Sequence, residues 1–197
     1  MQLTTQRAKP NKKQALFMVK ELIKEQGLTY ELECLYKYFL PALPTKPKTK
    51  EQWVQRVAAK NQKDIREYLH NCHVLDGSLY ATDGHRMHWT YTSLDNGDYH
   101  HATLEPVTDV PGRYPDVKRV IPKHKKFDTV RPNEVETITI NDLPRVVVHG
   151  ITLDAQYFHE ACAGFESVTM HYNTEHDSVL ISHDFGYAVV MPVRNPK

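Results

Sequence analysis

The chain has 197 residues, a length that suits one domain with or without an appendage. Its 40% hydrophobic and 25% charged residues are typical of a globular protein with a true core. No apolar run approaches the roughly 20 residues that a membrane helix needs, and the polar, basic start shows no secretory signal. Three cysteines with no close pair fit a reducing cytoplasm rather than a disulfide framework. We therefore do not expect a membrane protein, a fibrous protein or a fully disordered chain.

The net charge of +1 conceals an asymmetry along the chain. Residues 1–64 hold 13 Lys and Arg against 6 Asp and Glu, a net charge of +7. The remaining 12 basic and 18 acidic residues give residues 65–197 a net charge of −6. A basic front of this kind indicates either a solvated helical surface or a face for nucleic acid or an acidic partner.

The front of the chain is predicted to be helical. Apolar residues at helical spacing follow Asn11 and stop at Gly27, and a second such pattern runs over 29–40 until Pro41. The proline-bearing stretch 41–48 is typical of a semi-rigid linker. Thr49 and Gln52 then form a capping-box pattern at the start of a third helix, expected over 49–61.

After Lys63 the pattern changes to strands separated by turn signals, of which Asp76-Gly77 is the strongest hairpin signal. A connection rich in proline and lysine is expected over 112–126, and one short helix over 154–163, closed by Gly164. The predicted strands are 64–75, 78–82, 85–91, 99–107, 136–140, 145–149, 165–172, 178–183 and 187–193.

The order of these elements predicts an α+β fold. Helix, strands, connection, strands, helix and strands suggest two similar units, each with one helix on a small antiparallel sheet. We divide the chain into a helical N-terminal extension with its proline-rich linker, 1–47, and a body, 48–197.

The sequence offers little chemistry for an enzyme. It contains no GxSxG, Walker A, GxGxxG, CxxC or HExxH motif, and no spacing marks a pair of catalytic carboxylates. The twelve histidines do not form a metal motif, because the pair His85 and His88 would point to opposite faces of a strand. We expect no catalytic residue, no metal and no cofactor, and we expect Cys34, Cys72 and Cys162 to be small buried hydrophobes.

Four segments far apart in the sequence together resemble one family. They are DIREYL at 64–69, ATDGHRM at 81–87, GRYPDVKRVIPK at 112–123 and YAVVMPVR at 187–194. The bacterial β sliding clamp, the processivity subunit of DNA polymerase III, carries DVRYYL, ATDGHRL, GRFPDYRRVLPK and YVVMPMR in the same order. Residues 48–197 therefore resemble a sliding clamp, and the resemblance implies a processivity-clamp-like domain.

In the clamp these segments form a hydrophobic cleft that holds the QLxLF-like linear motif of clamp-binding proteins. The resemblance implies that Leu, Met and Val side chains form an apolar floor and that arginines rim it. The implied cleft residues are Leu69, Thr82, Gly84, His85, Arg86, Met87, Pro115, Arg119, Val120, Val189, Val190, Met191, Pro192, Val193 and Arg194.

The chain also departs from the clamp pattern. Only 25 residues separate Arg86 from Gly112, where a clamp places a whole half-domain, and the clamp's first domain has no counterpart. A clamp encircles DNA with basic inner helices. Here the helix at 49–61 offers Lys50, Arg56 and Lys60 as candidate DNA contacts, whereas the helix at 154–163 has no Lys or Arg.

Three hypotheses follow. The first is a cytoplasmic, truncated clamp-like binding protein, of a kind that would suit a phage. It would hold the motif of a polymerase or another replication protein, either as an accessory factor or as a decoy. The second is a self-assembling clamp that encircles DNA. The third is a DNA-binding regulator that uses the basic helical N-terminus, where 21–40 fits a helix–turn–helix pattern with Gly27 in the turn.

Overall fold

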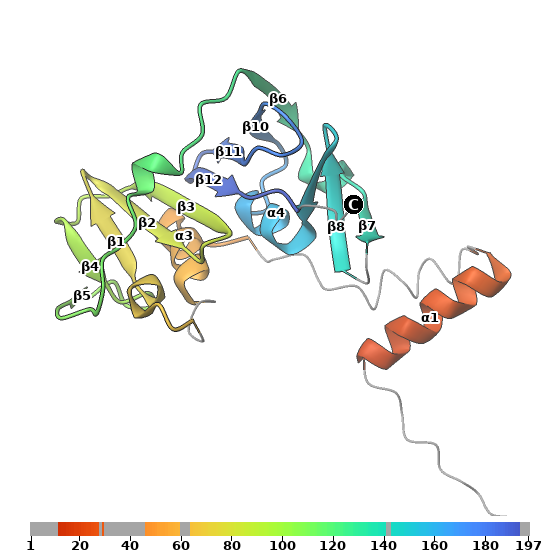
Figure 1. Ribbon diagram of the computed structural model, residues 1–197, viewed down its shortest axis with the longest axis horizontal. Coiled ribbons are helices and arrows are strands. Elements are labelled where there is room, and N and C mark those ends of the chain that lie inside the picture. Colours follow the sequence, from red (N-terminus) through yellow and green to blue (C-terminus); the bar gives the residue numbers. More distant parts are fainter. Residues whose placement is uncertain (1–11, 28, 30–45, 60–63, 141–142, 194–197) are drawn as a thin grey trace, which may run out of the picture. The chain divides into compact units, whose positions relative to one another are not determined.

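The computed structural model describes residues 12–27, 29, 46–59, 64–140 and 143–193. The chain divides into two compact units, Met1–Leu43 and Pro44–Lys197, near the boundary that the sequence places after residue 47. Figure 1 shows the course of the chain through both units. No helix in the described ranges is long and apolar enough to cross a membrane.

The first unit contains helix α1, Lys12–Gln26, as the apolar spacing predicts. The helix ends at Gly27, whose φ of +80° favours glycine and whose N–H donates to the Ile23 carbonyl at 2.9 Å. Val19 is buried, whereas Phe17 and Met18 are exposed. The second helix predicted at 29–40 lies almost entirely outside the described residues.

The second unit is built largely from antiparallel strands. Short 3₁₀ helices lie between them at η1 (Glu67–His70), η2 (Val117–Arg119) and η3 (Pro132–Glu134). The strands are β1 (Cys72–Leu75), β2 (Ser78–Thr82), β3 (Arg86–Tyr91), β4 (Gly97–Tyr99), β5 (Pro106–Val107), β6 (Lys126–Val130), β7 (Thr137–Ile140), β8 (Leu143–Val148), β9 (Ile151–Asp154), β10 (Val168–Tyr172), β11 (Val179–His183) and β12 (Gly186–Val190).

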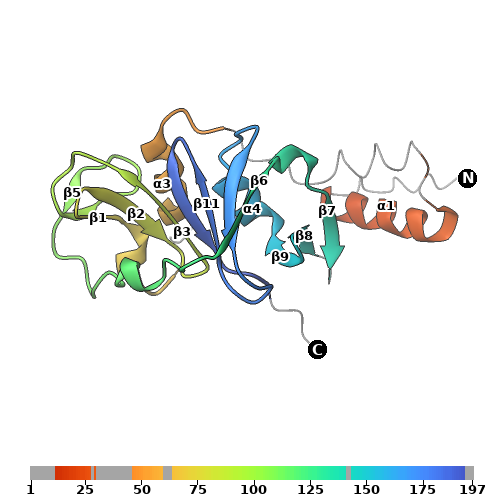
Figure 2. The same ribbon diagram turned by 90° about the horizontal axis from the view of Figure 1, so that it is seen from above.

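The described strands form one nine-stranded sheet, in the order β5-β4-β1-β2-β3-β12-β11-β10-β6, and a three-stranded sheet, β7-β8-β9. Every pair is antiparallel, as predicted. The two sequence halves share the larger sheet, because β3 pairs with β12 in the register Met87 to Val189. Figure 2 shows strands of this sheet in a view turned by 90° from that of Figure 1. The two expected units are therefore joined by a continuous ladder rather than built on separate sheets.

Two helices cover one face of the larger sheet. Helix α3 (Lys50–Ala59) packs on β2 and β3, and helix α4 (Ala155–Ala161) packs on β12, β8 and β9. The predicted capping residue begins α3: Thr49 Oγ1 accepts from the Gln52 N–H at 3.2 Å. Asp154 caps α4 by accepting from two backbone N–H groups. The main core lies between these helices and the sheets.

The opposite face of the larger sheet carries a second apolar cluster. Side chains alternate along a strand, so Leu79 and Ala81 of β2 enter the main core while Tyr80 between them faces the other way. The connection after Gly112 folds over this second face and contributes to it. Its buried members are Leu69, Tyr80, Met87, Trp89, Tyr114, Val117 and Val189.

The structure corrects the predicted strands in several regions. The strand expected over 64–75 starts only at Cys72, because Asp64 accepts from the Arg66 N–H at 2.8 Å and the chain then turns into η1. The strand expected over 99–107 is wrong: the chain forms only the short strands β4 and β5, because it turns between them, where the Leu104 N–H donates to the His100 carbonyl at 2.9 Å. Strands β6 and β9 lie where no strand was predicted. In β6 only Val130 is buried, so an alternating pattern that would have marked it is missing.

Candidate functional site

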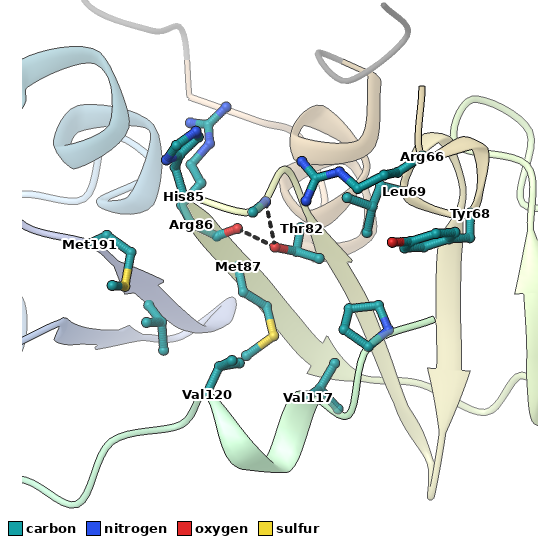
Figure 3. A pocket seen from close by; sticks show the side chains of 13 residues that line it. Arg66, Tyr68, Leu69, Thr82, His85, Arg86, Met87, Val117, Val120 and Met191 are labelled. Atoms are coloured by element: carbon teal, nitrogen blue, oxygen red, sulfur yellow. Dashed lines mark hydrogen bonds between the residues drawn. The ribbon is translucent and has the colours of Figure 1, made fainter. Parts of the chain in front are cut away.

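A hollow of about 180 Å³ opens on the face of the second apolar cluster. It lies where η1, the turn from β2 to β3, the end of β12 and the connection around η2 meet (Figure 3). All four segments that the sequence singled out contribute to it. The lining residues are Arg66, Tyr68, Leu69, Thr82, Gly84, His85, Arg86, Met87, Pro115, Val117, Val120, Val189 and Met191. We call this hollow the cleft.

The floor of the cleft is apolar and densely packed. Leu69, Met87 and Val189 come from η1, β3 and β12, and each is at most 3% exposed. Val120 and Met191 stand at the rim, with 50% and 48% of their surface exposed. The Met191 N–H donates to the His85 carbonyl at 3.0 Å, which ties the end of β12 to the turn. The cleft therefore offers exposed apolar surface on a fixed backbone.

The turn from β2 to β3 is built by its own polar side chains. The Thr82 hydroxyl donates to the Arg86 carbonyl at 2.7 Å and accepts from the Gly84 N–H at 3.1 Å. Asp83 Oδ1 accepts from the backbone N–H groups of His85 and Arg86, both at 3.0 Å. These bonds satisfy backbone groups that a tight turn leaves without ladder partners. The TDGHR segment is thus a self-supporting wall of the cleft.

Arg66, which sequence reasoning did not single out, forms part of the cleft wall. Its guanidinium donates twice to Asp64, from Nε at 2.9 Å and from Nη2 at 2.7 Å. These side-chain hydrogen bonds lower the pKa of Asp64 below its ordinary value and raise the pKa of Arg66. Asp64 therefore holds a permanently charged donor group in a set orientation beside the cleft.

We expect Gly84→Ala to disturb this wall. Gly84 has a φ of +88°, and a Cβ there would lie 3.1 and 3.2 Å from the two terminal guanidinium nitrogens of Arg66. The left-handed backbone costs an alanine about 1 kcal/mol, and Arg66 must also move. Urea unfolding should show that loss. Gly150→Ala is a matched control, because its φ of +79° is similar and a Cβ there meets nothing within 4 Å. If Gly84→Ala and Gly150→Ala lower the free energy of unfolding by the same amount, the contact between position 84 and Arg66 has no specific role.

Arg86 was expected at the rim of the cleft, but its side chain does not lie there. It contributes to the lining, but its side chain is fully buried and lies on the helix side of the sheet, because Met87 next to it faces the cleft. Its guanidinium pairs with Asp83 at 3.0 Å and with Glu160 of α4, and it lies 4.3 Å from the centre of the Tyr157 ring. Burial lowers the pKa of Arg86, and the charge of Asp83 opposes this shift.

The structure brings most of the predicted cleft residues together, with four further exceptions in the described chain. Val190 is buried in the main core, since it alternates with Val189. Arg119 is exposed and does not line the cleft. Pro192 and Val193 are half-buried and do not line it either; the Val193 N–H donates to the Thr152 carbonyl. Arg194 lies outside the described residues.

Tyr68 and Val117 line the cleft but were not predicted. Tyr68 belongs to η1, which the sequence pattern had placed in a strand. Val117 and Val120 are three residues apart across the short helix η2, and positions at this spacing share one side of a 3₁₀ helix. A search for this spacing beside Pro115 would have identified Val117.

The comparisons with known proteins concern the fold. No protein-family model and no curated protein matches the sequence. Crystal structures of sliding clamps do match. The DNA polymerase sliding clamp of Pseudomonas aeruginosa has a TM-score of 0.52 at 18% identity, covering 79% of this chain and 70% of that one. The protein has a sliding-clamp-like fold.

Two further clamps agree with this assignment. The sliding clamp (DNA polymerase III subunit beta) of Bartonella birtlesii, bound to griselimycin, matches with a TM-score of 0.55 at 16% identity and covers 74% of this chain. The DNA polymerase III beta subunit of Thermotoga maritima matches with a TM-score of 0.52 at 17% identity and covers 80%. The match spans 64% and 69% of these two clamp chains. The clamp-like fold that the four segments implied is thus confirmed, with identities that speak for the fold alone.

Helices α3 and α4, which the sequence analysis considered for contact with DNA, differ in charge. On α3, Lys50 and Arg56 are half-buried, and Lys50 Nζ donates to the Tyr91 carbonyl at 2.7 Å. Lys60 lies outside the described residues. On α4, His159 and Glu160 are buried, and burial lowers the pKa of His159. Neither helix presents a row of exposed basic side chains within the described residues.

The described part of the chain contains no cluster of metal-binding side chains, and the cysteines in it are buried. No group of three or more His, Cys, Asp and Glu side chains there could hold a metal ion. His85 lies at the cleft while His88 is buried against Trp53, so this pair does diverge as predicted. Cys72 and Cys162 are buried, as expected, and Cys34 lies outside the described residues.

Proposed function

We propose that this protein is a replication-related, non-catalytic binding protein that holds the QLxLF-like linear motif of a polymerase or another replication protein. It would act as an accessory factor or as a decoy for such motifs. The observation that supports the proposal most is the convergence of four dispersed segments, 64–69, 81–87, 112–123 and 187–193, on one apolar cleft in a clamp-like fold. The structural neighbours are sliding clamps of DNA polymerases, and the Bartonella birtlesii clamp is bound to griselimycin.

The physical character of the cleft favours a short peptide. A hollow of about 180 Å³ has room for a few side chains rather than for a folded surface. Its floor of Leu69, Met87 and Val189 suits leucine and phenylalanine anchors, which usually carry most of the affinity in such contacts. Arg66 supplies N–H donors at the wall for peptide carbonyl or acidic groups. Methionines let the same floor adapt to different partners.

A DNA-encircling role receives less support from the described residues. The amine of Lys50 already donates to a backbone carbonyl, Arg56 is half-buried, and α4 carries no basic residue other than the buried His159. The proposal therefore depends on the cleft rather than on the candidate DNA contacts Lys50, Arg56 and Lys60.

Fluorescence anisotropy with a labelled QLxLF peptide tests the proposal. We expect saturable binding to the full chain, and Val120→Asp should weaken it by at least about tenfold, or 1.4 kcal/mol, because a carboxylate would be desolvated against the bound apolar anchor. Val120 is 50% exposed, so the variant should fold.

The matched control is Val147→Asp. Val147 is 44% exposed on β8 in the three-stranded sheet and does not line the cleft. It should bind the peptide like the wild type. Absence of saturable binding by the wild-type chain, or equal loss in both variants, would refute the proposed function.

Accessory and decoy roles can then be separated in a primer-extension assay with a polymerase that carries the motif. An accessory factor should lengthen the products, whereas a decoy should shorten the products of a reaction that depends on a true clamp. The Val120→Asp variant should abolish either effect.

A further inference from the structure

The methionines of the cleft differ sharply in exposure. Met191, just after β12, is 48% exposed at the rim, whereas Met87 on the floor is 2% exposed. Met170 in the main core is fully buried. Figure 3 shows the side chains of Met191 and Met87 at the same cleft. Oxidants therefore reach the sulfur of Met191 directly, but they reach the sulfur of Met87 only when the fold opens.

The described thiols are poor targets for the same oxidants. Cys72 and Cys162 are at most 1% exposed. Burial raises the pKa of Cys72 to about 12 and raises the pKa of Cys162 as well, so neither forms the reactive thiolate at neutral pH. The exposed sulfur-containing side chain at the cleft is therefore Met191, a thioether, whereas the two described thiols are buried.

We propose that Met191 is a site of reversible methionine oxidation that lowers the affinity of the cleft for its apolar ligand. This inference rests on the proposed function. A hydroperoxide transfers one oxygen atom to Met191 Sδ: the S–O bond forms as the O–O bond breaks, sulfur is oxidised, and hydrogen peroxide is reduced to water. The product is methionine sulfoxide. A methionine sulfoxide reductase converts it back with a dithiol as the reductant: the sulfoxide oxygen leaves as water, and the dithiol is oxidised to a disulfide.

The geometry explains why this modification would matter. The Met191 N–H is fixed by the His85 carbonyl at 3.0 Å, so the side chain has to start at the rim of the cleft. A sulfoxide is polar and a strong hydrogen-bond acceptor, and burying it under an apolar anchor removes its water without supplying a donor. Leu69, Met87 and Val189 offer it no hydrogen bond. Oxidation therefore converts part of an apolar rim into a polar one.

The test combines peptide mapping with binding. The full chain is treated with dilute hydrogen peroxide, and mass spectrometry follows each methionine. We expect Met191 to be oxidised well before Met87 and Met170, and the Kd for the labelled QLxLF peptide to rise about tenfold. Treatment with methionine sulfoxide reductases should restore the original Kd.

Two variants make the result specific. Met18 on α1 is 55% exposed and should also be oxidised, but Met18→Leu should leave the peroxide effect on binding intact. Met191→Leu, compared with its own untreated Kd, should lose that effect. The inference is overturned if Met87 is oxidised as fast as Met191, if Kd is unchanged after Met191 is oxidised, or if Met191→Leu responds like the wild type. Failure of the untreated wild type to bind the peptide would instead refute the proposed function, and the binding part of the inference with it.

Discussion

Arg86→Ala is expected to lower the free energy of unfolding by about 3–5 kcal/mol, because it leaves buried charges without their partner. The Arg86 side chain is fully buried between Asp83 and Glu160, both of which are 8% exposed at the side chain. Asp83 also accepts two backbone N–H groups in the wall of the cleft. Urea unfolding monitored by circular dichroism should report the loss, and weaker peptide binding should accompany it.

Lys118→Ala is the control for this experiment. Lys118 pairs with Asp76 at 2.7 Å, but both side chains are more than half exposed, so the midpoint of unfolding should hardly change. Similar midpoints for Arg86→Ala and Lys118→Ala would show that the buried network does not stabilise the fold as we infer.

Trp53→Ala should cost about 3–5 kcal/mol of stability, the loss typical of removing a large buried aromatic side chain. Trp53 of α3 is fully buried, and its ring stacks on His88 of β3 with centroids 4.5 Å apart. Its indole N–H donates to the Glu160 carbonyl of α4 at 2.8 Å. One side chain thus connects both helices to the sheet. Fluorescence of Trp89, the other tryptophan, can follow unfolding of the variant.

Trp53→Phe separates packing from hydrogen bonding. It keeps an aromatic ring in the core but leaves the Glu160 carbonyl without its indole donor, so we expect a smaller loss than for alanine. If Trp53→Ala unfolds at the same urea concentration as the wild type, the helices do not depend on this contact.

Local turn and cap chemistry accounts for the elements that were predicted correctly. Asp76 and Gly77 both have positive φ, 51° and 72°, as a two-residue hairpin turn requires, and Asp-Gly is a strong signal for it. His149 and Gly150 adopt nearly the same angles, 51° and 79°, between β8 and β9. Histidine is a weak turn signal, so the sequence predicted the hairpin at Asp76-Gly77 but not the one at His149-Gly150.

The cleft was predictable from the resemblance of four segments, but the direction of individual side chains was not. Adjacent strand residues cannot face the same way, so Val189 at the cleft requires Val190 in the core, and Met87 at the cleft turns Arg86 away from it. Arg66 escaped prediction because its place depends on the carboxylate of Asp64, a local pairing that no periodicity reveals.

The pairing of β3 with β12 has a consequence for biosynthesis. The floor of the cleft joins Met87 to Val189, residues separated by about half the chain, and the rim includes Met191 close to its end. Residues 87 to 191 must therefore all have left the ribosome before this surface exists. A nascent chain that has not yet released Met191 lacks part of the cleft, so any ligand of the cleft can bind only after that point of synthesis.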